Sequence, residues 1–292
     1  MRLRYRGKPG EALEWFDRLY ADLKIKFYKP DQEEPKKQTL VRYPRSLRIG
    51  TYREFMTLPV NDSSIEIAIG RNGKGTTDEL KDGFIEFNPA KVYPSKELEF
   101  VYKRLLSTPE IELELVRWDF ATDYPVERER LALLRDARKY GCQISEGFTE
   151  YLGTRHKNGF VKLYDKQKEL QHQGKVCAEP LTRLEITIEE KPGKAIWTDM
   201  DGKATPAKEW PRVVAVPEKV PENAFGLKGL VVLAWVEGHI PLERCLVQVK
   251  PRSRTNIRNF VAEECGMLIP PKDFDRCRNE AIAWTTNYGG KI

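Results

Sequence analysis

In three segments of the chain, polar and apolar side chains alternate. The segments run from Leu115 to Asp123, from Phe160 to Lys166 and from Thr182 to Ile188. Successive side chains of a β-strand point to opposite faces of a sheet, so each segment predicts a strand with one apolar and one polar face. We therefore expect a sheet whose apolar back packs against a core and whose polar front faces solvent.

The polar faces of these predicted strands carry charged side chains and a tyrosine. They hold, in chain order, Arg117, Asp119 and Asp123; Lys162, Tyr164 and Lys166; and Arg183, Glu185 and Thr187. An arginine and an acid two positions apart on a strand usually form ion pairs on a solvated face, and a lone tyrosine is usually a half-buried sheet residue. Their joint occurrence on three segments favours a chemical site, but the pattern leaves both interpretations open.

Tyr164 is the candidate nucleophile of such a site. A phenol is a weak nucleophile because its pKa is about 10. The cations of Lys162 and Lys166 would favour the phenolate, and they would also attract a phosphodiester. A tyrosine between two lysines is therefore typical of a nucleophile that attacks phosphate.

Acidic residues on the other two segments are candidate ligands of a divalent metal. Carboxylate oxygens suit Mg²⁺ or Mn²⁺, and Asp119, Asp123 and Glu185 would supply them. The ion would polarise a scissile phosphate, while Arg155 and Lys166 would hold its oxygens. The residues thus predict a DNA-nicking transesterification, in which the tyrosine becomes linked to phosphate and a deoxyribose hydroxyl is released.

The composition permits contact with nucleic acid without requiring it. Lys and Arg total 50 against 44 Asp and Glu, a net charge of +6. His156, His172 and His239 form neither a His-x-His pair nor a His-x-x-Arg element, which argues against a two-histidine metal site and a tyrosine recombinase. Five widely spaced cysteines and the lack of a long apolar run predict a cytoplasmic protein with reduced thiols and no membrane contact.

The remaining periodicities predict an α+β fold, with a largely antiparallel sheet and helices on one face. Helices are expected over 10–25, 95–106 and 126–140, and strands over 47–52, 65–69, 84–87, 111–123, 150–154, 160–166 and 182–188. The recurrence of a helix followed by about three strands indicates a duplicated unit. We expect a catalytic nicking domain over 1–190, with possible halves 1–92 and 93–190.

Beyond residue 190 the chain becomes rich in proline and lysine, which predicts a linker or irregular excursion over 191–222. Residues 223–292 are expected to form a small, mostly helical accessory domain that is a candidate for DNA binding. Its expected elements are helices over 223–236, 254–264 and 272–285, and a short strand over 242–249.

Candidate DNA contacts lie on the predicted sheet and in two basic segments. Lys162, Arg117 and Arg183 belong to the sheet; Arg71 and Lys74 belong to a glycine-rich turn; and Arg252, Arg254 and Arg258 belong to the densest basic stretch. The turn, Gly70–Gly75, lacks the spacing of a phosphate loop and predicts a hairpin tip. A solvated turn and a solvated helix start remain the alternatives to contacts with phosphates or base edges.

Four short motifs occur in an order that is similar to a known family. They are Arg117-Trp-Asp-Phe-Ala-Thr-Asp123, Thr149-Glu-Tyr-Leu-Gly-Thr-Arg155, Lys162-Leu-Tyr-Asp-Lys-Gln-Lys-Glu169 and Arg183-Leu-Glu185. The chain resembles the replication initiation factor family, which comprises rolling-circle initiators of small plasmids and filamentous phages and related conjugative relaxases. The resemblance covers residues 116–188 clearly and the N-terminal half only in pattern.

The resemblance implies a Tyr-x-Lys nucleophile, here Tyr164, and a divalent metal held best by Asp119 and Glu185, with Asp123 a weaker match. It also implies a 5′-phosphotyrosine intermediate and a free 3′-hydroxyl for a polymerase. Tyr151 is the rival nucleophile, since it also precedes an arginine-bearing turn.

The function expected from the resemblance is a rolling-circle DNA replication initiator in the cytoplasm of a bacterial host. A conjugative relaxase has the same chemistry, and a non-catalytic origin- or operator-binding protein is the alternative from another class. The expected partners are origin DNA, single-stranded or as a supercoiled or hairpin form, a helicase of the host or plasmid, and a second copy in a homodimer.

Overall fold

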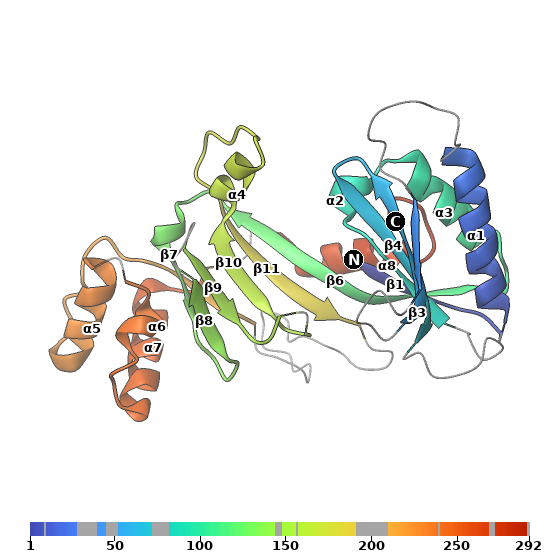
Figure 1. The fold of residues 1–292 in the computed structure, drawn as a ribbon. Helices are drawn as coiled ribbons and strands as arrows, with labels where there is room; N and C mark the ends of the chain where they lie inside the picture. Colours follow the sequence, from blue (N-terminus) through green and yellow to red (C-terminus); the bar gives the residue numbers. More distant parts are fainter. Residues whose placement is uncertain are drawn as a thin grey trace. The chain divides into compact units, whose positions relative to one another are not determined.

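The computed structural model describes residues 1–8, 10–27, 40–44, 52–71, 82–143, 148–155, 157–190, 210–238, 240–268 and 272–290. These residues form two compact units (Figure 1). Unit 1 comprises Met1–Trp118 and Asp275–Ile292, and unit 2 comprises Asp119–Phe274. The expected α+β class with a large antiparallel sheet is confirmed.

Unit 1 contains antiparallel strands in the order β2–β3–β4–β5–β1, followed by the first half of β6. Their bounds are β1 Arg2–Arg6, β2 Val41–Pro44, β3 Tyr52–Val60, β4 Ser63–Arg71, β5 Asp82–Glu86 and β6 Glu112–Tyr124. A two-residue turn, Asn61 and Asp62, joins β3 to β4. Asn61 has a φ of 51°, which asparagine adopts more readily than most residues.

Among the described residues of unit 1, three α-helices precede β6: α1 Glu11–Phe27, α2 Pro89–Val92 and α3 Lys96–Leu106. Helix α1 packs on β4 and α3. It buries Ala12, Trp15, Phe16, Leu19 and Leu23, whose spacing of three to four residues forms one apolar face. Ser95 caps α3 as expected, because its side chain accepts a hydrogen bond of 3.2 Å from the backbone N–H of Leu98.

The end of the chain also belongs to unit 1. Helix α8, Phe274–Ala283, leads to Trp284, whose ring packs edge-on against four other aromatic rings, including that of Tyr288 at 6.3 Å. The centroid separations are 5.3 Å to Phe87, 5.5 Å to Tyr102 and 5.6 Å to Tyr93. This aromatic cluster ties residues close to the C-terminus to α3 and to the end of β5.

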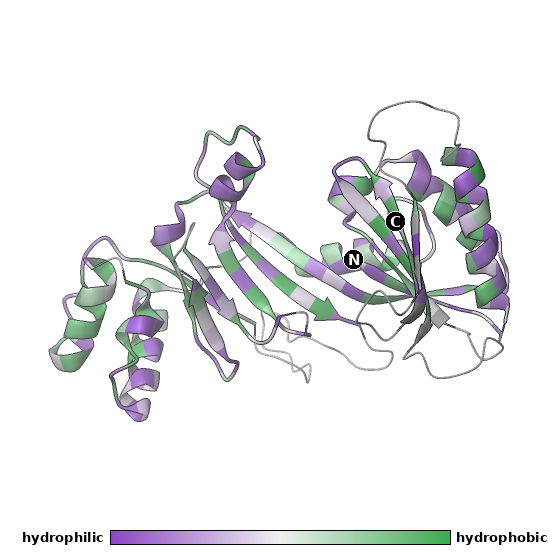
Figure 2. Ribbon diagram, viewed as in Figure 1, coloured by the Kyte–Doolittle hydropathy of each residue, from purple (hydrophilic) through white to green (hydrophobic). Residues whose placement is uncertain are grey.

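Unit 2 contains the second half of β6 and four further strands in the order β6–β11–β10–β9–β8. Their bounds are β8 Tyr140–Gln143, β9 Thr149–Leu152, β10 Val161–Asp165 and β11 Thr182–Glu189. Figure 2 shows polar and apolar residues in alternation along β10 and β11. The three alternating segments therefore form strands as expected. These strands, β6, β11 and β10, are neighbours in the sheet.

A second core of unit 2 is built from a two-stranded sheet and three helices. Strands β7 Leu131–Leu134 and β12 Arg212–Ala215 pair, and helices α5 Gly226–Val236, α6 Leu242–Cys245 and α7 Pro251–Cys265 pack with them. Helix α5 is apolar over most of its length (Figure 2). Leu134, Val214, Trp235 and Ile257 are among the buried residues of this core.

The helix expected over 126–140 is wrong. That segment forms a 3-10 turn, η3 Arg128–Arg130, then β7 and the start of β8. All four residues of β7 are buried, so the apolar run has no solvent face of a surface helix. Asp136 then accepts a 2.7 Å hydrogen bond from the backbone N–H of Arg138, a local bond that competes with helix formation.

The strand expected over 242–249 is also wrong, because the segment begins with α6. Leu242, Leu246 and Val249 are buried at a helical spacing rather than in alternation. The compact units differ in their bounds from the expected domains: β12 lies within the expected linker, and residues 275–292 belong to unit 1. Among the described residues, no helix is long and apolar enough to cross a bilayer.

Candidate functional site

The strands of unit 2 bring the predicted site residues onto one face of the sheet, here called the front face. Strands β10 and β11 pair so that Lys162 lies opposite Glu185 and Tyr164 lies opposite Arg183. Residues that are directly opposite share a face, so these four side chains form two adjacent rows across the strands. Strand β6 lies next to β11 and adds acidic residues to the same face.

Tyr164 is the most enclosed residue of this group. The residue is only 6% exposed, and its hydroxyl lies 3.4 Å from Oε2 of Glu185. The Nζ atom of Lys162 lies 3.7 Å from the centroid of the ring, and that of Lys166 lies 6.0 Å away. The ammonium group of Lys162 therefore lies over the ring of the phenol, and that of Lys166 lies farther away.

The electrostatics of Tyr164 differ from the expectation that its lysines favour the phenolate. Burial raises the pKa of Tyr164 well above its usual value, and the carboxylates of Glu185 and Glu169 raise it further, against the opposing charge of Arg183. In this structure the phenol is accordingly protonated at neutral pH.

Asp119 and Glu185 form an acidic pair on neighbouring strands. Burial raises the pKa of Glu185, and the negative charge of Asp119 raises it further, while Lys162 and Arg183 lower it. Thr187 donates a 2.7 Å hydrogen bond from Oγ1 to Oδ1 of Asp119, which orients that carboxylate. A cation between the two carboxylates would relieve their repulsion.

Asp123 is bound by a guanidinium. Arg183 donates from Nε and Nη2 to the two oxygens of Asp123 at 2.6 and 2.7 Å. Burial acts to raise the pKa of Asp123, but Arg183 outweighs it and the pKa is lowered. Both oxygens of Asp123 are thus engaged, and Arg183 is held in one orientation beside Tyr164.

The donor set fits a metal with few protein ligands. Across the described ranges, no group of three or more His, Cys, Asp or Glu residues is arranged to hold a metal ion. Asp119 and Glu185 remain as a pair, since Asp123 is occupied by Arg183. Mg²⁺ commonly binds through one or two carboxylates and keeps water or substrate phosphate as its other ligands, so the pair suits it.

Other predicted residues lie outside this group. Arg117 belongs to unit 1, where it pairs with Glu86, which also binds Arg2. Arg155 is exposed in the segment after β9. Lys74 and His156 lie outside the described residues, as does the side chain of Arg71.

Lys166 does not belong to the strand that carries Tyr164. Strand β10 ends at Asp165, which caps helix α4, Lys166–His172, by accepting a 2.8 Å hydrogen bond from the backbone N–H of Lys168. Lys166 pairs with Glu169 at 3.0 Å. Glu169, which influences Tyr164, is absent from the sequence prediction, although its position three residues after Lys166 is an ion-pair spacing of helices.

The basic stretch of the accessory segment opens α7 as expected, but two of its arginines make internal contacts. Arg254 donates to the backbone carbonyls of Val249 and Val247 at 2.5 and 2.7 Å. Arg258 binds both oxygens of the buried Glu243 at 2.6 Å. Arg252 is exposed. Contact of these residues with DNA remains a prediction.

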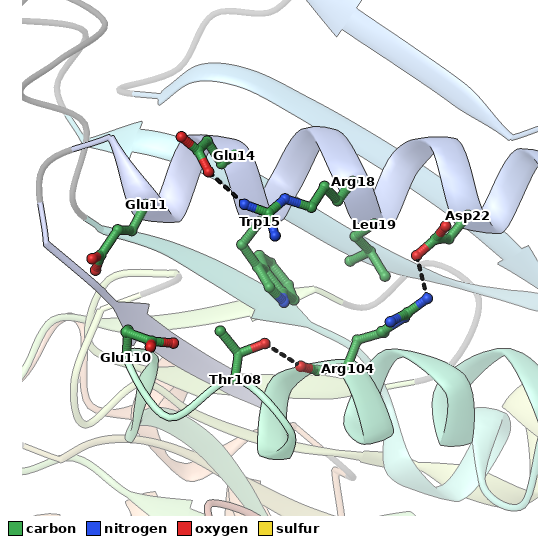
Figure 3. Close-up of a pocket in the computed structure, with 9 residues that line it drawn as sticks. All are labelled: Glu11, Glu14, Trp15, Arg18, Leu19, Asp22, Arg104, Thr108 and Glu110. Carbon is green, nitrogen blue, oxygen red and sulfur yellow. Dashed lines mark hydrogen bonds and ion pairs between the residues drawn. The ribbon is translucent and has the colours of Figure 1, made fainter.

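Unit 1 contains a separate cavity of about 350 Å³ between α1 and the end of α3 (Figure 3). It is lined by Glu11, Glu14, Trp15, Arg18, Leu19, Asp22, Arg104, Thr108 and Glu110. Arg18 pairs with Glu14, and Arg104 pairs with Asp22. The lining has four acidic and two basic side chains, so it disfavours a phosphodiester.

Together, these features define an α+β protein with a tyrosine, lysines and an acidic pair on one sheet face. No protein-family model matches the sequence, and no curated protein matches it. Among solved structures, the rolling circle replication initiator protein from Geobacillus stearothermophilus aligns over 93% of this chain and 97% of its own, with 12% identity and a TM-score of 0.28. A TM-score of that size does not establish a common fold, so the function is argued from the front face.

Proposed function

We propose that this protein initiates rolling-circle replication by nicking and rejoining one strand of origin DNA. The observation that carries the proposal is the position of the Tyr164 hydroxyl, 3.4 Å from Glu185 and in the row next to Lys162. A nucleophile, a proton acceptor and a cation for phosphate lie together on neighbouring strands.

In the proposed reaction, the hydroxyl oxygen of Tyr164 attacks the scissile phosphorus. Its proton passes to Oε2 of Glu185, and the bond from phosphorus to the 3′-oxygen breaks. The departing 3′-oxygen takes a proton from water, which leaves a 3′-hydroxyl and a 5′-phosphotyrosine. Attack by a 3′-hydroxyl on the phosphotyrosine reverses these steps and rejoins the strand.

Lys162 has a second role in this proposal because it covers the ring of Tyr164. A phosphate that binds the ammonium group of Lys162 draws it away from the ring, and the phenol then becomes accessible. Arg183, fixed by Asp123, remains beside the phenol and favours its ionised form. Substrate binding and activation of the nucleophile are in this way coupled.

Asp119 and Glu185 are the proposed ligands of Mg²⁺ or Mn²⁺. The bound ion would neutralise negative charge that develops on the scissile phosphate. Asp119 and Glu185 would hold the ion, while Oε2 of Glu185 contacts the hydroxyl of Tyr164. A helicase and a second copy of the chain remain proposed partners.

One assay tests the proposal directly. The protein is mixed with single-stranded oligonucleotides that tile its replicon, with Mg²⁺ or Mn²⁺ present, and a covalent adduct is sought on a denaturing gel. We expect an adduct with the wild type and with Tyr151→Phe, and none with Tyr164→Phe, since only the latter removes the attacking oxygen. An adduct that persists in Tyr164→Phe would contradict the assignment.

A non-catalytic origin- or operator-binding protein is the second candidate. The burial of Tyr164 and its raised pKa favour it. Under this alternative, no adduct forms with any oligonucleotide although binding is retained. A conjugative relaxase would form the same adduct, and only an origin of transfer among the reactive sequences distinguishes it.

A further inference from the structure

Two aromatic rings stack on the front face beside the rows that hold Tyr164. They belong to Tyr151 in β9 and Phe160, the residue before β10. Their centroids are 5.8 Å apart and their planes differ by 17°. Tyr151 lies directly opposite Lys162, so its ring is on the same face as the lysine and the nucleophile.

The backbone around these rings favours their close approach. Gly153 has a φ of 88°, and a Cβ atom there would lie 3.2 Å from the carbonyl oxygen of Gly159 and 3.4 Å from Cα of Phe160. Glycine therefore lets the end of β9 approach the residue before β10. Phe160 also accepts a 2.9 Å hydrogen bond from the backbone N–H of Thr187, the residue that binds Asp119.

On its β8 side, the hydroxyl of Tyr151 donates a 3.3 Å hydrogen bond to Oε1 of Gln143, while little covers its ring there. Its neighbour across β8 is Gly141, which has no side chain, and a Cβ atom there would be 3.9 Å from the ring. Tyr151 and Phe160 are both partly exposed to solvent. The strands thus present, in order, a glycine, an aromatic ring, a lysine and a carboxylate: Gly141, Tyr151, Lys162 and Glu185.

We infer that Tyr151 and Phe160 form a stacking platform for a nucleobase of single-stranded DNA, next to the phosphate that meets Lys162. The inference rests on the proposed function for the identity of the bound chain. An aromatic ring beside a cation fits a base followed by its phosphate, and stacking of this kind accepts any base. It also assigns Tyr151 a binding role that needs its ring and not its hydroxyl.

The test compares two fluorescent oligonucleotides of equal length and charge, an oligothymidylate and an abasic strand, by anisotropy in buffer with EDTA. We expect the wild type to bind the oligothymidylate more tightly by about tenfold, since stacking on aromatic side chains contributes at about this level. Tyr151→Leu and Phe160→Leu should reduce this preference strongly. Tyr151→Phe should keep it, because the ring remains.

Phe225→Leu is the matched control, because Phe225 is an aromatic residue of unit 2 that is 76% exposed at the start of α5. It should leave the preference unchanged. Where a leucine variant fails to fold, quenching of 2-aminopurine in an oligonucleotide bound to the wild type reports stacking directly.

Equal binding of the two oligonucleotides by the wild type, absence of quenching, or a preference that survives both leucine substitutions would overturn the inference. These outcomes are independent of strand cleavage. A preference for bases without a Tyr164 adduct would support the stacking platform and contradict the nicking function. An adduct without a preference for bases would support the nicking function and contradict the platform.

Discussion

Tyr164 is surrounded by charge and almost excluded from solvent. Its hydroxyl contacts Glu185, and the ammonium group of Lys162 lies over its ring. A phenol in this state is a poor nucleophile, because it is protonated and the ammonium group of Lys162 lies over its ring. We expect its reactivity to depend on the bound substrate more than on the pH of the medium.

Alternation in the sequence predicted that Tyr164, Lys162 and Glu185 share a face, and they do. It did not predict that Lys162 lies directly opposite Glu185, because register depends on pairing between strands. Alternation also did not predict the ion pair between Asp123 and Arg183, since the two residues are 60 positions apart in the chain.

Glu86 provides a test of pH dependence at a single residue. Burial acts to raise the pKa of Glu86, but Arg2 and Arg117 outweigh it, so the pKa is lower in the folded than in the unfolded chain. The ionised carboxylate therefore stabilises the fold at neutral pH, and this contribution is lost as the pH falls through the folded pKa. We expect Glu86→Gln to cost about 1–3 kcal/mol at neutral pH.

The measurement is urea unfolding of both proteins across the acidic range. The difference between them should shrink as the pH falls below the usual pKa of a glutamate, about 4.3, and be lost once the pH falls through the lowered pKa of folded Glu86. Glu112→Gln, at an exposed carboxylate that begins β6, serves as control and should be close to neutral. A difference that stays constant with pH would show that Glu86 does not titrate as proposed.

At the scale of elements, the segment after β6 illustrates a limit of sequence patterns. Its leucines and charges resemble a helix, but Arg128 is fully buried and pairs with the buried Glu150 at 2.5 Å. Glu150 also accepts hydrogen bonds from the Tyr140 hydroxyl and the backbone N–H of Leu133. A buried ion pair between segments 22 residues apart has no local signature, and it holds β7, β8 and β9 in their places.

Removal of Arg128 should therefore destabilise unit 2. Arg128→Met leaves the charge of Glu150 buried without its partner, and we expect a loss of about 3–5 kcal/mol in unfolding free energy. Adding Glu150→Leu should recover part of this loss, because the uncompensated charge is then gone. Chemical denaturation measures each variant.

Arg130→Met is the control, since Arg130 is exposed in the same 3-10 turn. Its effect should stay within about 0.5 kcal/mol. If Arg128→Met behaved like Arg130→Met, the pair would contribute little to the fold.

At the scale of the whole chain, the first and last parts of the sequence fold together. The hydroxyl of Tyr288 accepts a 3.1 Å hydrogen bond from the backbone N–H of Ser95 across 193 positions of sequence. Helical periodicity predicted α8 itself, but its partner could not be read from a local pattern. The expected domain bounds consequently assigned the end of the chain to the accessory segment.

Substitution of Trp284 tests whether the C-terminal residues stabilise unit 1. Trp284→Ala removes the ring that contacts Phe87, Tyr93 and Tyr102, and we expect unit 1 to lose about 3–5 kcal/mol. Hydrogen exchange should report reduced protection in α3 and β5, with β10 and β11 unaffected. Unchanged exchange in α3 would contradict the role of the cluster.

Strand β6 continues without interruption through Trp118 and Asp119, where unit 1 gives way to unit 2. A domain joined by a flexible linker can be exchanged between genes or released by a protease as an intact module. Here the boundary lies inside a strand instead of a linker, and the β6 residues that pair with β1, Glu112 to Arg117, all precede it. A protease would have to unfold part of β6 before it could cut between Trp118 and Asp119, so limited proteolysis should begin elsewhere in the chain.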